Sequence, residues 1–170
     1  GHGALLENLN EQDAEILFIK NIDNVVPDRS LEEIGAWKEV LAGYLLKVQS
    51  KAFSFHRMLV DGTVDHDLLK RVHAFLETGL NVRFPDAFPG YSLEEQMAVL
   101  IDKLSRPIRV CGMVRNEGDP GGGPFWIKDA MGNESLQIVE SAQVDLEDEA
   151  QVEIFEKATH FNPVDLVCGV

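Results

Sequence analysis

The sequence GHGALLENLN (residues 1–10) opens the chain, and after a turn it is followed by ILFIKNIDN (residues 16–24). The first stretch is typical of a glycine-flanked loop that opens a short helix, and the second of an apolar strand ending at Asp23. Glycines let a backbone approach a ligand closely, and a helix N-terminus offers unpaired N–H groups and a positive dipole end. Because α/β proteins bind ligands where strands end, the pattern predicts an α/β fold with a nucleotide or other anion at this loop. An ordinary helix start and an Asx turn are the alternative, which the pattern alone favours.

Two parts of these stretches resemble sugar-nucleotide pyrophosphorylases, in particular the UDP-N-acetylhexosamine and UDP-glucose branches. The first match is the opening loop from Gly1 to Leu5, and the second is the pair Asp23 and Asn24. A longer resemblance, over most of the chain, is to a bacterial family of unknown function related to these enzymes. It is carried by the opening loop, by IKNIDNVVPD (residues 19–28) and by RVCGMVRNEGDPGGGPFW (residues 109–126).

The resemblance implies an α/β domain of the nucleotide-diphospho-sugar transferase type, with a mixed sheet flanked by helices and a large helical insertion. It also implies nucleotidyl transfer, in which a nucleoside triphosphate and a sugar 1-phosphate react and pyrophosphate leaves. A divalent ion assists such chemistry by neutralising phosphate charge, and Mg²⁺ prefers hard oxygen ligands, so Asp23 is the implied metal ligand. The implied nucleotide-binding residues in these stretches are Gly1, His2, Gly3 and Asn24.

The basic, glycine-rich loop with which these pyrophosphorylases hold the triphosphate has no counterpart in the sequence. The chain begins inside the motif set, lacks an initiator Met and ends in an apolar run from Leu166 to Val170. Residues 1–170 are therefore interpreted as a single α/β domain or a fragment, and this chain alone is expected to be inactive as a pyrophosphorylase. A non-catalytic module that binds or assembles with sugar nucleotides is the alternative.

Composition limits the kinds of partner. The chain has 170 residues, 45% of them hydrophobic, which suffices for the core of one domain. Lys and Arg number 15 against 29 Asp and Glu, and the formal charge of −14 argues against nucleic acids and anionic membranes as partners. No apolar run of about 18 residues and no signal-peptide pattern occur, so a cytoplasmic protein is expected. Cys111 and Cys168 suggest neither a disulfide framework nor a metal site, and no oligomeric state is indicated.

Helical periodicity predicts a helical insertion over about residues 30–105. Ser30 with Glu33, and Ser92 with Glu95, have the spacing of a capping box, and Asp65 or Asp67 opens the helix between them. The apolar runs beyond the insertion predict strands over residues 108–114, 125–128, 136–140 and 165–170, with an acidic helix over residues 146–157.

The stretch from Arg115 to Trp126 is a second candidate site, because it contains Gly121, Gly122 and Gly123 in succession. Glycines make the loop mobile, prolines bound it, and the planar guanidinium of Arg115 is suited to pairing with a phosphate. A mobile hairpin without a ligand is the alternative that spacing alone favours, and the resemblance makes the two equally supported. If the loop closes over a ligand, Gly122→Val is expected to reduce binding more than stability.

The run from His160 to Leu166 resembles the segment that lines the sugar side of the cleft in the pyrophosphorylases. The resemblance implies that Asn162 hydrogen-bonds sugar hydroxyls; in the alternative it starts a turn before Pro163. The remaining histidines lack the spacing of metal ligands and are interpreted as surface or packing residues. No Ser-His-Asp order or Cys-His pair stands out, so covalent catalysis has no support.

Overall fold

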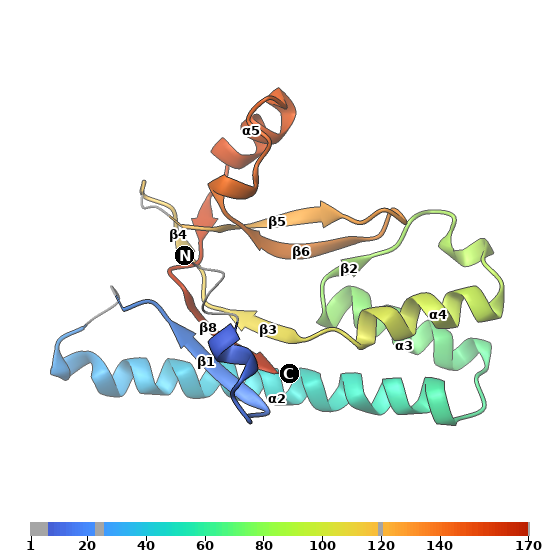
Figure 1. Cartoon of the computed structure of the whole chain (residues 1–170). Helices are drawn as coiled ribbons and strands as arrows, with labels where there is room; N and C mark the ends of the chain where they lie inside the picture. Colours follow the sequence, from blue (N-terminus) through green and yellow to red (C-terminus); the bar gives the residue numbers. More distant parts are fainter. Residues whose placement is uncertain (1–6, 23–25, 119–120, 170) are drawn as a thin grey trace.

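The computed structural model describes residues 7–22, 26–118 and 121–169. In these residues, helices and three small sheets form an α/β fold, which confirms the predicted class (Figure 1). The predicted mixed sheet is wrong for this part of the chain, because every described strand pairing is antiparallel. Neighbouring strands are joined by hydrogen bonds in the three orders β1-β8-β3, β2-β6-β5 and β4-β7.

The first sheet joins the two ends of the described chain. It consists of β1 (Ile16–Lys20), β8 (Asp165–Gly169) and β3 (Ile108–Cys111), with Val167 of β8 opposite both Phe18 and Val110. Val167 is fully buried, since this face of the sheet lies against the long helix α2 (Leu31–Asp61) (Figure 1). The opposite face carries Arg109 and Cys168, which are register partners.

The second and third sheets use short strands. The second contains β2 (Val82–Arg83), β6 (Glu134–Val139) and β5 (Gly123–Lys128), and the third pairs β4 (Val114–Arg115) with β7 (His160–Phe161). The strand predicted over residues 108–114 therefore divides in two. The division lies at Gly112, whose N–H donates to the Asp165 carbonyl. Before this residue the chain pairs with β8, and after it the chain pairs with β7.

The helical layer lies where the sequence predicts it, as α2, α3 (His66–Gly79) and α4 (Leu93–Leu104). The capping box at Ser92 forms, with Glu95 N–H donating to Ser92 Oγ and Ser92 N–H donating to the Glu95 carboxylate. The box predicted at Ser30 does not form. Ser30 ends a 3₁₀ turn, η1 (Asp28–Ser30), and has helical rather than extended dihedrals, so its hydroxyl makes no cap bond.

The core lies among these three helices. Their apolar faces are packed together around Leu59, Val72, Leu76 and Leu100, all at most 2% exposed. The strand β2, which the sequence did not predict, pairs with β6 and so connects the helical layer to the second sheet. The described chain also contains the turns η2 (Phe88–Gly90) and η3 (Ser141–Gln143) and the helix α5 (Glu149–Glu156).

Helix α5 stands apart from the rest of the molecule (Figure 1). Asp148 caps it by accepting hydrogen bonds from the N–H groups of Ala150 and Gln151. Phe155 stacks on Phe125 of β5, with the ring centroids 5.4 Å apart. None of the described helices has the length and apolar character needed to cross a membrane.

Candidate functional site

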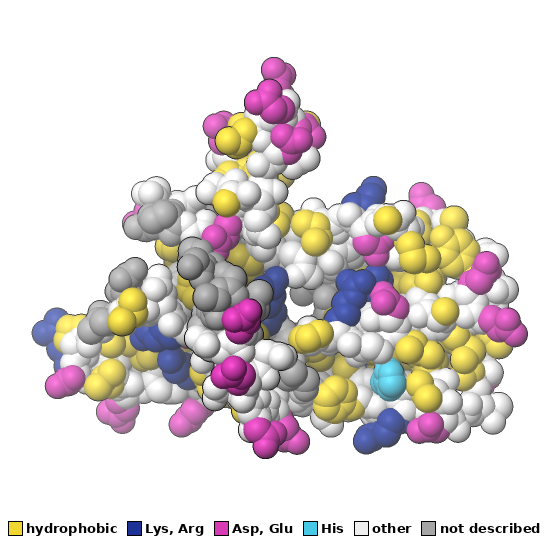
Figure 2. Space-filling model, viewed as in Figure 1, with side chains coloured by type: hydrophobic (Ala, Val, Ile, Leu, Met, Phe, Trp, Pro, Cys, Tyr) yellow, Lys and Arg dark blue, Asp and Glu magenta, His cyan; other side chains and the backbone are white. Residues whose placement is uncertain are grey.

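A cavity of about 470 Å³ lies between the first and second sheets. It is lined by β3 and β6, by the turn after α3 and by the end of α4. The space-filling view shows the molecule hollowed at this position, with Lys and Arg side chains beside the hollow (Figure 2). Its volume is within the range of about 300–1,000 Å³ that small-molecule sites occupy.

The lining of this cavity has the opposite charge to the protein. Lys103, Arg106 and Arg109 contribute to it, and no Asp or Glu is among the described residues that line it. The chain as a whole carries a formal charge of −14. Because the long-range field of the protein repels anions, a basic lining is what an anionic ligand needs to bind here.

Arg109 is the cation of the cavity that is not neutralised by a described carboxylate. It is exposed on β3, and its Nη2 donates to Oε1 of Gln137 on β6 at 2.7 Å. A neutral amide satisfies one N–H of the guanidinium and leaves its charge in place. Arginine presents its donors as a planar fork that matches the oxygens of phosphate and carboxylate groups.

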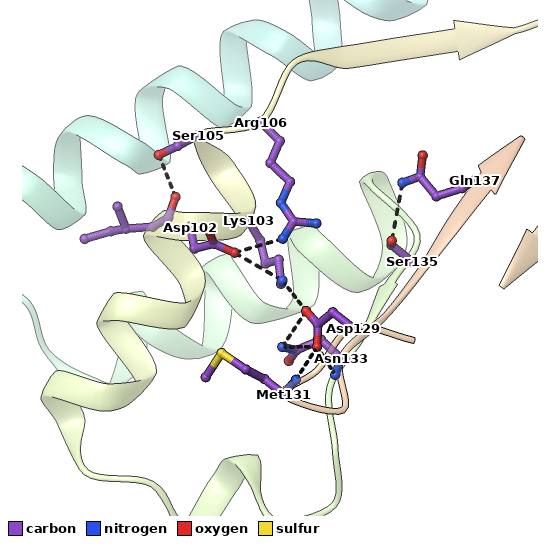
Figure 3. Close-up of polar contacts among 10 residues, drawn as sticks. Asp102, Lys103, Ser105, Arg106, Asp129, Met131, Asn133, Ser135 and Gln137 are labelled. Atoms are coloured by element: carbon purple, nitrogen blue, oxygen red, sulfur yellow. Dashed lines mark hydrogen bonds and ion pairs between the residues drawn. The ribbon is translucent and has the colours of Figure 1, made fainter. Parts of the chain in front are cut away.

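Lys103 and Arg106, by contrast, are paired with acids (Figure 3). The Lys103 side chain is only 4% exposed, and its Nζ lies 2.7 Å from Oδ2 of Asp129 and 3.1 Å from Oδ2 of Asp102. Arg106 Nη2 lies 3.0 Å from the same Asp102 oxygen. The Lys103–Asp129 pair connects the end of α4 to the turn between β5 and β6, and all three pairs lower the net charge that the two cations give the cavity.

Asp129 organises that turn. Its Oδ1 accepts hydrogen bonds from the backbone N–H groups of Met131 and Asn133, and the Asn133 amide reaches both carboxylate oxygens. Burial raises the pKa of the Asp129 carboxyl, but the hydrogen bonds from Lys103 and Asn133 outweigh it and hold the pKa well below its usual range. Asp129 therefore remains ionised at neutral pH and compensates the buried Lys103.

Two thiols lie near the guanidinium. Cys111 lines the cavity and shares a face of β3 with Arg109, and Cys168 is the register partner of Arg109 on β8. Both are free, and burial raises the pKa of each thiol, although the charge of Arg109 opposes this. A thiol with a raised pKa is mostly protonated at neutral pH and is a weak nucleophile, so neither has the properties of an activated catalytic cysteine.

The structure describes only some of the sequence-predicted site residues. Gly1, His2, Gly3, Asp23 and Asn24 lie outside the described residues.

The others lie near the third sheet. Arg115 is exposed on β4 and is not among the residues that line the cavity. Gly121 and Gly123, with His160, line a smaller cavity of about 220 Å³, and His160 lines the larger cavity as well. Gly122 forms a bridge with Asn162. The loop is therefore shorter than the sequence predicts, because Gly122 is bridged to Asn162 and Gly123 begins β5.

Asn162 has its hydrogen-bonding groups engaged within the chain. It is 3% exposed; its Nδ2 donates to the Gly112 carbonyl at 2.6 Å, and its Oδ1 accepts from the Val164 N–H at 3.0 Å. Val164 has a positive φ of 57°, which is rare for a β-branched residue. Asn162 thus fixes the strained turn before β8, and the structure favours the turn interpretation over a contact with sugar hydroxyls.

The sequence interpretation missed Arg109 and Gln137. The available signal was a charged residue inside the apolar run Ile108 to Cys111, where an Arg must face away from the core. Its partner, 28 positions later in β6, could not be recognised, because the contact depends on how two different sheets are placed.

Fold and cavity together define an α/β protein with a basic site between two antiparallel sheets. The chain belongs to the family described as a domain of unknown function, DUF4301, whose model matches residues 1–170. The predicted membership of a family of unknown function is thereby confirmed, whereas the relation to sugar-nucleotide pyrophosphorylases stays a prediction. Comparisons with curated proteins and with solved structures gave no match.

Proposed function

We propose that this protein binds a nucleotide or a sugar phosphate, with a phosphate group held by Arg109 in the cavity between the first and second sheets. The observation that carries the proposal is the unneutralised guanidinium in a cavity of suitable volume. Binding of a phosphate there replaces solvent around the guanidinium with charge-assisted hydrogen bonds, which are roughly twice as strong as neutral ones. Arg106, on the same lining, adds a second source of donors.

Charge complementarity must be local in this protein. Salt screens interactions beyond about 10 Å at 0.1 M ionic strength, so the many surface carboxylates weaken attraction from a distance but act less on a ligand already in the cavity. Affinity for a phosphate is therefore expected to depend on the guanidinium of Arg109 far more than on the net charge of the chain.

Arg109→Met tests this proposal. We expect UDP-glucose and glucose 1-phosphate to bind at least tenfold more weakly, because a charge-assisted hydrogen bond contributes roughly 1.5–3 kcal/mol. Isothermal titration calorimetry measures the affinity of each ligand for the variant and the parent. Arg71→Met is the matched control, since Arg71 is exposed on α3, pairs with Asp67 and does not line the cavity. Equal affinities for the parent and Arg109→Met, or no binding by the parent, would contradict the proposal.

Nucleotidyl transfer is the reaction that the resemblance implies, and the binding site proposed here fits one part of it. The reaction also requires a divalent cation, for which the sequence offers Asp23. Within the described ranges no group of three or more His, Cys, Asp or Glu residues could hold a metal ion, and Asp23 lies outside them. We therefore derive no catalytic step, and propose binding as the function that the described residues support best.

Asp23→Asn tests the metal proposal separately. If Asp23 holds Mg²⁺, the amide, which has no negative charge, should abolish the gain in UDP-glucose affinity that Mg²⁺ produces, while binding without the metal is unchanged. Calorimetric titrations with and without Mg²⁺ measure this gain. Asp13→Asn, a change of the same chemistry at an exposed position, is the control. If Mg²⁺ raised the affinity for UDP-glucose equally in the parent and in Asp23→Asn, Asp23 would not be the metal ligand.

A further inference from the structure

The hydrogen bond from Arg109 to Gln137 crosses the cavity. Arg109 lies on β3 of the first sheet and Gln137 on β6 of the second, and both residues line the cavity. Among the described residues, this 2.7 Å contact is the side-chain hydrogen bond that directly links these two sheets. Its geometry therefore determines where the guanidinium lies relative to the cavity.

The amide of Gln137 is itself held in place. Its Nε2 lies 3.3 Å from Oγ of Ser135, two positions earlier on the same strand and hence on the same face. With Nε2 engaged in this way, Oε1 is the group that accepts from Arg109. The chain Ser135–Gln137–Arg109 thus fixes a long, flexible side chain that would otherwise lose considerable rotamer entropy when it binds a ligand.

We propose that Gln137 is a positioning residue that holds Arg109 in the cavity without cancelling its charge, so that the guanidinium is preorganised for an anion. The nature of that anion rests on the proposed function. A carboxylate at this position would form an ion pair with Arg109 and occupy the donors that the phosphate needs. An apolar residue would leave the charge but release the side chain. The neutral amide of Gln137 both holds the Arg109 side chain in place and leaves the positive charge of the guanidinium available to the ligand.

The first experiment compares Gln137→Glu and Gln137→Met by ligand binding and thermal unfolding. For Gln137→Glu, which has nearly the same shape as the parent, we expect the affinity for glucose 1-phosphate to fall at least tenfold while Tm stays the same or rises. For Gln137→Met we expect a smaller loss of affinity, about threefold. A merely structural role would lower Tm and affinity together. Unchanged affinity in Gln137→Glu would overturn the proposal.

The second experiment needs no phosphate ligand, because Cys111 lines the same cavity and its thiol experiences the charge of Arg109. Rates of Cys111 alkylation by iodoacetate, an anion, and by iodoacetamide, which is neutral, are measured by mass spectrometry. Their ratio cancels the fraction of thiolate and reports the local potential. We expect the iodoacetate to iodoacetamide ratio to fall at least threefold in Gln137→Glu, and to fall in Arg109→Met as well, because either substitution removes the uncancelled positive charge from the cavity.

The two experiments separate the proposals. If the parent binds no phosphorylated ligand but the alkylation ratio falls as expected, the proposed function fails and the role of Gln137 in presenting an uncancelled charge stands. If the parent binds glucose 1-phosphate and neither the affinity nor the ratio responds to Gln137→Glu, the positioning role fails and the proposed function stands.

Discussion

Asp129→Asn is expected to lower the free energy of unfolding by roughly 3 kcal/mol, the lower end of the range for removing one partner of a buried ion pair, because Lys103 is buried and Asp129 is partly exposed. Lys103 is 4% exposed, so loss of the nearest carboxylate leaves a buried ammonium with Asp102 as its remaining described acid. The same substitution weakens the hydrogen bonds that shape the turn before β6. Urea unfolding at pH 7 measures the loss.

Asp67→Asn is the control for this prediction. Asp67 pairs with Arg71 at 3.7 Å, but both side chains are more than half exposed, and such surface pairs contribute less than about 1 kcal/mol. If Asp129→Asn and Asp67→Asn were equally mild, the Lys103–Asp129 pair would not be the connection between α4 and the second sheet that the structure indicates.

The low pKa of Asp129 also predicts how the two proteins respond to acid. The folded-state pKa lies below the value of about 3.9 for an unfolded Asp, so the stabilisation is fully present above that value and is lost as pH falls through the folded-state pKa. The difference in unfolding free energy between the parent and Asp129→Asn should therefore be constant from pH 7 to about pH 5 and narrow below about pH 4.

The helices were predictable because their signals are local. Caps at Asp65 and Ser92 depend on groups three residues apart, and apolar spacing follows from the pitch of the helix. The failure at Ser30 has a local cause as well: a 3₁₀ turn precedes α2 and changes the dihedrals of the serine. β2 was missed because two residues carry no periodicity, and its existence depends on β6, more than fifty positions away.

The antiparallel sheets and the cavity were harder to predict, because both depend on contacts between distant parts of the chain. The resemblance implied a mixed sheet, whereas β8 pairs antiparallel with β1 and β3. Glycines and prolines drew the functional interpretation to the loop near Gly122, since such residues are conspicuous in a sequence. Arg109 and Gln137 can be recognised as a pair only in the structure, where the first and second sheets bring them into contact.

The run Gly121 to Gly123 is where the structure differs most from the sequence-based expectation of a loop that closes over a ligand. Gly122 is buried, its carbonyl accepts from the Asn162 N–H at 2.8 Å, and a Cβ placed on it would lie 2.5 Å from Cγ2 of Ile138 and 3.1 Å from Cγ of Glu140. Glycine is needed here because the backbone passes close to β6. The space that a ligand-closing loop would require is taken by the chain itself.

Gly122→Val is accordingly expected to reduce the free energy of unfolding by about 2–3 kcal/mol, since overpacking forces backbone or side-chain shifts. This reverses the sequence-based expectation that binding would suffer more than stability. Urea unfolding gives the loss, and Gly43→Ala is the control. Gly43 lies inside α2 with nothing within 4 Å of an added Cβ, so alanine should stabilise the protein by roughly 0.5–1 kcal/mol. A loss below about 0.5 kcal/mol for Gly122→Val would mean that residues 121–123 yield easily, as a mobile loop does, and would restore this segment as a candidate for closing over a ligand.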